Sequence, residues 1–239
     1  YARNPLINLT TMILIVAGGI GYTVWFDIID NIRNFRKKGE RRRGMFKILT
    51  LNSKVALTMT AILIVTGTVS FLFLEFSNPD TLGAFQSVTT RTAGFFTVPQ
   101  GDLREESVFI SCLLMFIGGS PAGTAGGVKT TTIAMLFLTA VTVVKGNKDT
   151  ECFGRRIPEE NIRTGISVML MSFTILMIGT IAVSVIESAG FLDILFETTS
   201  AIGTVGLSTG LTPALHTASK FVIMILMYAG RIGPVTMAL

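Results

Sequence analysis

The chain contains 239 residues, of which 49% are hydrophobic and 15% are charged, with a formal net charge of +5 and a mean hydropathy of +0.63. Soluble domains carry about 25% charged residues, so this balance excludes an ordinary water-soluble domain and predicts an integral membrane protein. One histidine and two cysteines, Cys112 and Cys152, leave little material for a transition-metal site, and we expect both thiols to be free and buried.

Five apolar segments are predicted to cross the membrane, because one crossing needs about 20 mostly apolar residues. The first, second and fourth contain no charged residue, the third is interrupted by a glycine-rich stretch, and the fifth carries one arginine. In chain order they are Leu6–Phe26, Val55–Leu74, Ser107–Val144, Thr164–Ile186 and Ala218–Leu239. Nothing before the first segment resembles a cleavable signal peptide, and we expect the chain to be cut from a longer protein.

Two loops carry the basic residues. Residues 31–47 hold eight basic residues and one acid, and residues 145–163 hold five basic residues and four acids. Short loops rich in lysine and arginine stay in the cytoplasm, which predicts that residues 75–106 and 187–216 face outside. A topology signal beside anionic lipid explains these charges better than binding of nucleic acid does. Docking of a cytosolic partner remains an alternative use of the same loops.

One tetrapeptide pattern occurs twice, at residues 92–95 and 204–207, with a spacing of 112 positions. Each copy follows a short apolar helix candidate, Ala84–Thr90 or Phe191–Ala201, that is too short to cross a membrane. The pattern of a hydroxyl residue, a small apolar residue, glycine and a bulky apolar residue resembles a potassium-channel filter, in which backbone carbonyls replace the hydration shell of the ion. A turn glycine in an outer loop is the alternative, and two copies at equal positions disfavour it. The sequence therefore predicts two units of span, pore helix, filter strand and span, in the same orientation.

The glycine-rich stretch Gly118–Gly127 contains five glycines and Pro121 within the third predicted span. Each glycine costs a helix about 1 kcal/mol and proline about 3 kcal/mol, so we expect this stretch not to be helical. Close packing of helices explains one or two glycines but not this number together with a proline. A Walker A loop is rejected because Val128 separates Gly127 from Lys129 and no strand precedes the stretch.

Five strings make the chain similar to the second half of a KtrB-type subunit of the Trk/Ktr/HKT superfamily of potassium transporters. They are GGIGYTVWFD (18–27), QSVTTRTAGF (86–95), GGSPAGTAGGVKTTT (118–132), ETTSAIGTVGLSTGLTP (197–213) and AGRIGP (229–234). The resemblance implies an all-α integral membrane fold with four repeats around a central pore, two of which lie in this chain. One departure is a short passage into the third pore helix at Gly83–Ala84. Either about a dozen residues are missing there or that helix is unusually short.

The resemblance divides the chain into repeats and loops. It places the inner helix of the second repeat at 1–29, a basic cytoplasmic loop at 30–53, the third repeat with a broken inner helix at 54–144, a second cytoplasmic loop at 145–163, and the fourth repeat with a truncated last helix at 164–239.

The expected site has two parts, a filter and a gate. The filter residues, with K⁺ at their carbonyls, are Thr92, Ala93, Gly94, Thr204, Val205 and Gly206. The resemblance implies that the glycine-rich stretch is an intramembrane gate, whose residues are Gly118, Gly119, Gly123, Gly126, Gly127, Lys129 and Arg231. An arginine inside a span is costly, and its five donors suit the exposed carbonyls of that stretch. Lys129 could instead reach the cytoplasm.

The function expected from these features is potassium uptake across the cell membrane, either passive or coupled to sodium. The resemblance implies a homodimer in contact with lipid, resting on a cytosolic nucleotide-binding regulatory ring, with no cofactor in this chain and no nucleic-acid partner. The alternative is a solute-coupled secondary transporter with broken helices, which more often has inverted repeats and a substrate-binding charge at mid-membrane. An enzyme is disfavoured because the predicted spans show no acid or histidine for acid–base chemistry.

Overall fold

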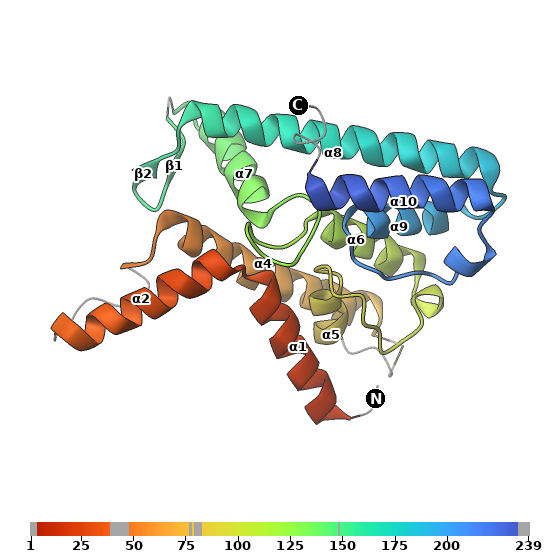
Figure 1. The fold of residues 1–239 in the computed structure, drawn as a ribbon, viewed down its shortest axis with the longest axis horizontal. Coiled ribbons are helices and arrows are strands. Elements are labelled where there is room, and N and C mark those ends of the chain that lie inside the picture. Colours follow the sequence, from red (N-terminus) through yellow and green to blue (C-terminus); the bar gives the residue numbers. More distant parts are fainter. Residues whose placement is uncertain (1–3, 39–47, 77, 79–82, 148, 234–239) are drawn as a thin grey trace.

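The computed structural model describes residues 4–38, 48–76, 78, 83–147 and 149–233 (Figure 1). The three arginines at 41–43 and Lys47, which belong to the basic loop predicted from the sequence, lie outside this part of the chain. The elements are α1 (Pro5–Gly19), α2 (Tyr22–Lys38), α4 (Leu51–Leu74), α5 (Gly83–Thr89), η1 (Gln100–Asp102), α6 (Glu105–Phe116), α7 (Thr130–Val144), β1 (Glu151–Cys152), β2 (Arg155–Arg156), α8 (Glu159–Ile186), α9 (Phe191–Ile202), η2 (Thr212–Ala214) and α10 (Thr217–Ile232). The strands β1 and β2 form one antiparallel pair, and helices make up most of the rest.

Two helices, α4 and α8, are long and apolar enough to cross a membrane by themselves. They contain the predicted spans Val55–Leu74 and Thr164–Ile186, and both predictions are confirmed. Both run along the long axis of the molecule, with the short helices α5, α6 and α9 gathered toward one end (Figure 1). The chain is therefore an all-α membrane protein, as its composition predicts.

The two predicted repeats have matching elements. Adding 112 to the residue numbers carries the end of α4 at Leu74 onto the end of α8 at Ile186, η1 onto η2, and the start of α6 onto the start of α10. The short helices α5 and α9 each precede a filter tetrapeptide, as expected, although α5 has seven residues and α9 has twelve. Gly83 and Ala84 both lie within α5.

The two units also share a matched hydrogen bond at the start of the inner helix. The Glu75 carboxylate accepts the Arg104 backbone N–H at 2.9 Å, and the Glu187 carboxylate accepts the His216 backbone N–H at 2.7 Å. Each glutamate follows the outer helix of its unit, and each bond reaches the start of the inner helix 29 residues later. These contacts satisfy one of the amide groups that every helix start leaves without an intrahelical partner.

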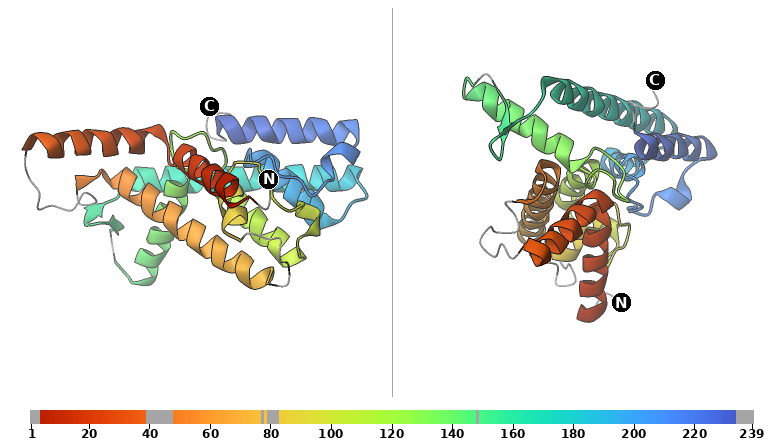
Figure 2. Two further views of the ribbon diagram at one scale, coloured as in Figure 1. Left: turned by 90° about the horizontal axis from the view of Figure 1, so that it is seen from below. Right: turned by 60° about the vertical axis from the view of Figure 1, so that its left-hand side comes forward.

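The segment Leu6–Phe26, predicted to cross the membrane, does not form one continuous helix. The chain bends by 91° between α1 and α2, and α2 extends through the first part of the expected loop at 30–53. Gly21 has a φ of +88°, a value that glycine adopts at little cost, and the Ala122 carbonyl accepts the Tyr22 N–H at 3.1 Å. The bend thus rests on a contact with a segment about 100 residues away, which local apolar composition does not reveal. Figure 2 shows α2 running away from the centre toward the end where α4 and α8 begin.

The third predicted span, Ser107–Val144, is split into α6 and α7. Residues 117–129 between them are not helical, which confirms the prediction from their glycines and proline. This gate loop, defined here as residues 117–129, crosses the middle of the molecule between α6 and α7 (Figure 1).

Candidate ion-conduction site

The two tetrapeptides predicted to form a filter, residues 92–95 and 204–207, have the same unusual backbone and are called the filter strands below. The angle φ is 64° at Thr92 and 51° at Thr204, and it is 76° at Gly94 and 89° at Gly206. Positive φ is uncommon for residues other than glycine, because the Cβ atom approaches the neighbouring carbonyl. Ala93 and Val205, between them, keep negative φ. Such alternation turns successive peptide planes, so that neighbouring carbonyls can face the same side of the strand.

The structure brings the two filter strands together. A Cβ atom at Gly94 would lie only 2.6 Å from the Val205 carbonyl oxygen, and one at Gly206 would lie 3.7 Å from the Gly94 Cα atom. Glycine is therefore required at 94 both by its φ and by the closeness of the opposite strand. The oxygens available along these strands are backbone carbonyls and threonine hydroxyls, which are hard ligands suited to alkali cations.

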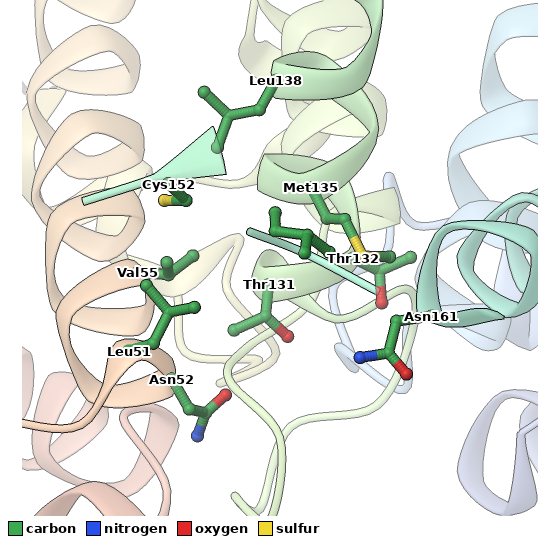
Figure 3. A pocket seen from close by; sticks show the side chains of 10 residues that line it. Leu51, Asn52, Val55, Thr131, Thr132, Met135, Leu138, Cys152 and Asn161 are labelled. Carbon is green, nitrogen blue, oxygen red and sulfur yellow. The ribbon is translucent and has the colours of Figure 1, made fainter. Parts of the chain in front are cut away.

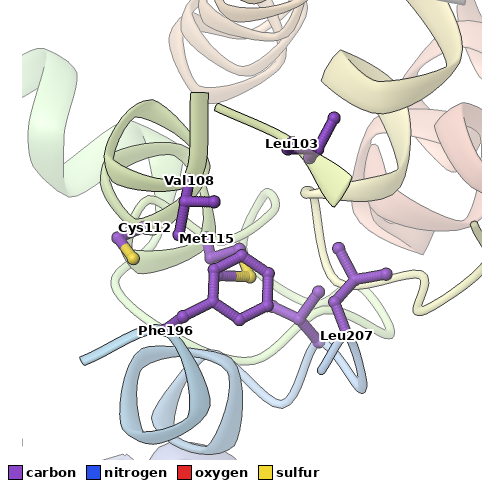
Figure 4. Close-up of a cluster of buried hydrophobic side chains, with 7 residues drawn as sticks. Leu103, Val108, Cys112, Met115, Phe196 and Leu207 are labelled. Atoms are coloured by element: carbon purple, nitrogen blue, oxygen red, sulfur yellow. The ribbon is translucent and has the colours of Figure 1, made fainter. Parts of the chain in front are cut away.

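The filter strand at residues 204–207, called the fourth filter after its predicted repeat, is anchored by an apolar cluster. Val205 and Leu207 are 4% and 2% exposed, and they pack with Phe196 of α9 and with residues of α6 (Figure 4). The complete cluster consists of Leu103, Val108, Cys112, Met115, Phe196, Val205 and Leu207. Because these strand side chains point into the cluster, the opposite side of the strand is left to the backbone.

A buried glutamate supports the segment after this strand. Glu197 of α9 accepts hydrogen bonds from the Ser208 hydroxyl and, at 2.6 Å, from the Thr212 hydroxyl. Glu197 was not among the residues predicted for the site, although a charged residue in the middle of a short, mostly apolar helix could have pointed to it. In the third repeat, the Gln86 side chain of α5 donates to the Gln100 side chain at 2.5 Å, and Gln100 donates to the Val98 carbonyl at 3.0 Å. Each pore helix therefore holds the segment that follows its filter.

The gate loop is closed at its base by backbone hydrogen bonds. Gly118 donates to the Val128 carbonyl at 2.9 Å, and Val128 donates to the Phe116 carbonyl at 3.3 Å. Ile117 and Val128 form a parallel bridge. The backbone groups that lose their helical partners between α6 and α7 are thus partly satisfied across the loop, as backbone at membrane depth requires.

The glycines of the loop allow close contact on two sides. A Cβ atom at Gly126 would collide with the Thr204 side chain of the fourth filter, and one at Gly119 would lie 3.0 Å from the Gly19 carbonyl oxygen. Gly123 also faces the end of α1, and Ser120 donates its N–H to the Gly19 carbonyl at 2.9 Å. The loop therefore lies between the fourth filter and the bend of the first inner helix.

Two cations bind consecutive carbonyls of the loop. The Arg231 Nη1 atom of α10 donates to the Thr124 carbonyl, and the Lys129 Nζ atom donates to the Ala125 carbonyl at 2.7 Å. The contact between Arg231 and the loop is the one anticipated from its donors. Lys129, the last residue of the loop, points back to a carbonyl four residues earlier instead of away from the loop. The structure thus brings both predicted cations into contact with the predicted glycine-rich loop.

The structure has one cavity beside the gate loop and another at the starts of α4, α7 and α8. One of about 220 Å³ is bounded by α1, the third filter and the gate loop. Another of about 230 Å³ lies at the starts of α4, α7 and α8 (Figure 3), away from both filter strands. Cys152 lines the second cavity, and burial raises the pKa of its thiol, which keeps it protonated. Both cysteines are free and buried, as predicted.

Comparison with known proteins gives a consistent result. The profile of the TrkH family, described as cation transport protein, matches residues 1–239. The Ktr system potassium uptake protein B of Bacillus subtilis is 40% identical over 247 residues, and the match covers 99% of this chain and 53% of that protein. The potassium/sodium uptake protein NtpJ of Enterococcus hirae is 35% identical, with 98% of this chain and 52% of that protein covered.

A solved structure supports the same fold. The crystal structure of the potassium transporter TrkH from Vibrio parahaemolyticus superposes with a TM-score of 0.74 at 17% identity, and covers 99% of this chain and 52% of that one. The chain spans about half the length of the relatives that it matches.

Proposed function

The chain belongs to the TrkH family of cation transport proteins, and from this premise we propose that it forms half of a pore through which potassium is taken up into the cell. The observation that carries the proposal is the paired backbone of the two filters, with positive φ at Thr92 and Gly94 and again at Thr204 and Gly206. Two matched strands of this kind, brought together at the centre, supply carbonyl oxygens that can replace water around an ion. The names of the relatives from Bacillus subtilis and Enterococcus hirae, both potassium uptake proteins, agree with this ion.

Rubidium uptake tests this proposal. The full-length protein, expressed in a strain without its own potassium importers, should restore growth at low K⁺ and accumulate Rb⁺. Excess K⁺ should suppress the Rb⁺ signal, and Na⁺ should suppress it less. Each filter has a single glycine, so we expect weaker discrimination against Na⁺ than a channel strand with two glycines provides. Absence of Rb⁺ uptake by protein that has reached the membrane would contradict the proposal.

The gate loop is the second part of the proposed mechanism. Its contact with Thr204 places it directly beside the fourth filter, and Arg231 and Lys129 hold two of its carbonyls. An arginine contact with a carbonyl is a charge-assisted hydrogen bond, stronger than a neutral one. In the proposed mechanism the loop blocks the path when these bonds are made, and ions pass when they break.

Sodium coupling, assembly and location are further parts of the proposal. The Enterococcus relative is named for both potassium and sodium, which supports Na⁺ as a second transported or coupling ion. We place the protein in the cell membrane as a homodimer that rests on a cytosolic nucleotide-binding regulatory ring. Uptake measured with and without external Na⁺ tests the coupling, and co-purification with the regulatory protein tests the ring.

A secondary transporter with broken helices is the alternative mechanism. The matched orientation of the two repeats favours the filter mechanism, because solute-coupled transporters more often have inverted repeats. Uptake that saturates with a solute other than an alkali cation would support this alternative.

A further inference from the structure

Arg91 is a buried cation next to the third filter that the proposed filter and gate do not use. It precedes Thr92 directly and is only 5% exposed. Its Nη2 atom donates to the Thr60 hydroxyl of α4 at 3.3 Å, and its Nε atom has no acceptor among the described residues. Within the same part of the chain, the side-chain ion pairs join other residues, Arg156 to Asp149 and Arg163 to Glu159. A guanidinium stays protonated at physiological pH, so Arg91 carries a positive charge that no carboxylate in the described structure neutralises.

Arg91 also borders a cavity beside the proposed ion path. Arg91 lines the cavity of about 220 Å³ together with Thr92 and Ala93 of the filter, Gly19 of α1 and Thr124 of the gate loop. The cavity thus lies between the filter and the loop that is proposed to obstruct it. A charge in a site shielded from water acts over longer distances than one on the surface, because the effective dielectric constant is lower.

The equivalent position of the other filter cannot hold such a residue. It is Gly203, 112 residues later, where a Cβ atom would lie 2.6 Å from the Met115 carbonyl oxygen. The positive charge is therefore placed beside one filter of the two. Burying an unpaired arginine costs much free energy, and an uncharged side chain would fill the same space at a lower cost. Packing alone therefore does not explain an arginine at position 91.

We propose that Arg91 is a charge-selectivity residue of the conduction path, which admits monovalent cations and repels divalent cations from the cavity beneath the filter. The proposal rests on the proposed function. Carbonyl oxygens alone attract a divalent ion of potassium size, such as Ba²⁺, more strongly than K⁺, because the attraction grows with the charge of the ion. A fixed positive charge opposes this preference, since it raises the energy of a divalent ion twice as much as that of a monovalent ion.

Inhibition by Ba²⁺ tests the proposal in the full-length protein reconstituted into liposomes. Neutralisation by Arg91→Gln should lower the half-saturating Rb⁺ concentration by about 5-fold and the half-inhibiting Ba²⁺ concentration by about the square of this factor, about 25-fold. Arg91→Lys keeps the charge and should stay within about two-fold of wild type on both measures. Arg155→Gln removes an exposed arginine from β2 and serves as the matched control, with no change expected.

The relation between the two ions separates an electrostatic role from a structural one. Equal changes for Rb⁺ and Ba²⁺, no change in Ba²⁺ inhibition, or an Arg91→Lys protein that behaves like Arg91→Gln would each overturn the proposal. In all of these cases wild-type Rb⁺ uptake would still support the proposed function. Failure of the wild-type protein to carry Rb⁺ would contradict the proposed function and this inference together.

Discussion

The filter strand after α9 is fixed on two sides, whereas the strand after α5 is fixed mainly by polar side chains. In the fourth repeat, Val205 and Leu207 are buried in the apolar cluster, and Glu197 holds the following segment through two hydroxyls. In the third repeat, Phe95 is 59% exposed, and the support comes from Gln86 and its neighbours. The same tetrapeptide pattern is therefore supported by an apolar cluster in one repeat and by polar side chains in the other. We expect the backbone of the strand at 92–95 to change conformation more easily than that of the strand at 204–207.

The inner helices differ at matched positions as well. Gly118 and Gly119 of the third repeat correspond, 112 residues later, to Gly230 and Arg231 of the fourth. After Phe116 the third inner helix gives way to the gate loop, whereas α10 continues to Ile232. One repeat thus supplies the loop and the other supplies, at the same position, the cation that binds it.

Serine at the two filter glycines should give the largest effect and should show which filter has less room. Positive φ costs a side chain about 1–3 kcal/mol, and at Gly94 overpacking against the Val205 carbonyl adds about 1–3 kcal/mol. We expect Gly206→Ser to weaken apparent K⁺ affinity by about 10-fold and Gly94→Ser by about 100-fold or more, with a poorer K⁺/Na⁺ ratio in both. Rb⁺ uptake with Na⁺ competition measures this, normalised to protein in the membrane. Unchanged selectivity in both variants would contradict the filter assignment.

Truncation of the last side chain of each filter strand should affect stability very differently in the two repeats. Leu207→Ala leaves a cavity in the apolar cluster and should lower the free energy of unfolding by about 2–5 kcal/mol. Phe95→Ala removes an exposed side chain and should change stability by about 0.5 kcal/mol or less. Thermal unfolding in detergent compares them. Equal losses of stability would show that the third strand is anchored as firmly as the fourth.

Removal of the Arg231 side chain should increase ion flux if the loop is a gate. Arg231→Ala deletes a charge-assisted hydrogen bond worth about 1.5–3 kcal/mol and should raise the maximal Rb⁺ uptake rate by up to about 10-fold, with the preference over Na⁺ retained. Shortening the loop within Gly119–Gly126 should act in the same direction. A purely structural role predicts less protein in the membrane and lower flux per molecule, so uptake normalised to surface protein decides between the two.

Loss of the matched caps should have the smallest effect. Glu75→Ala and Glu187→Ala each free one amide at the start of an inner helix, at a cost of about 0.5–2 kcal/mol. Glu75 is 5% exposed, whereas Glu187 is only half-buried, so we expect the larger loss at Glu75. Thermal unfolding in detergent measures both. A larger loss at Glu187 would show that the outer ends of the two repeats are not equivalent in the way their spacing suggests.

The sequence by itself determined the features that depend on local composition. Apolar runs identified α4 and α8, five glycines with a proline identified the non-helical gate loop, and the spacing of 112 residues identified two units with matching helices. These predictions succeed because hydrophobicity and helix breaking act within a few turns of chain.

Only the tertiary structure decided how distant backbone groups are paired. The bend at Gly21 depends on the Ala122 carbonyl, and the Glu75 cap acts on an amide 29 residues away. The burial of the Arg91 Nε atom without an acceptor is likewise a result of helix packing. The sequence predicted that Arg231 binds the loop, but only the structure shows that the acceptor is the Thr124 carbonyl. Such partners are chosen by packing of separate helices, because any backbone carbonyl has the same chemistry and sequence alone cannot distinguish one from another.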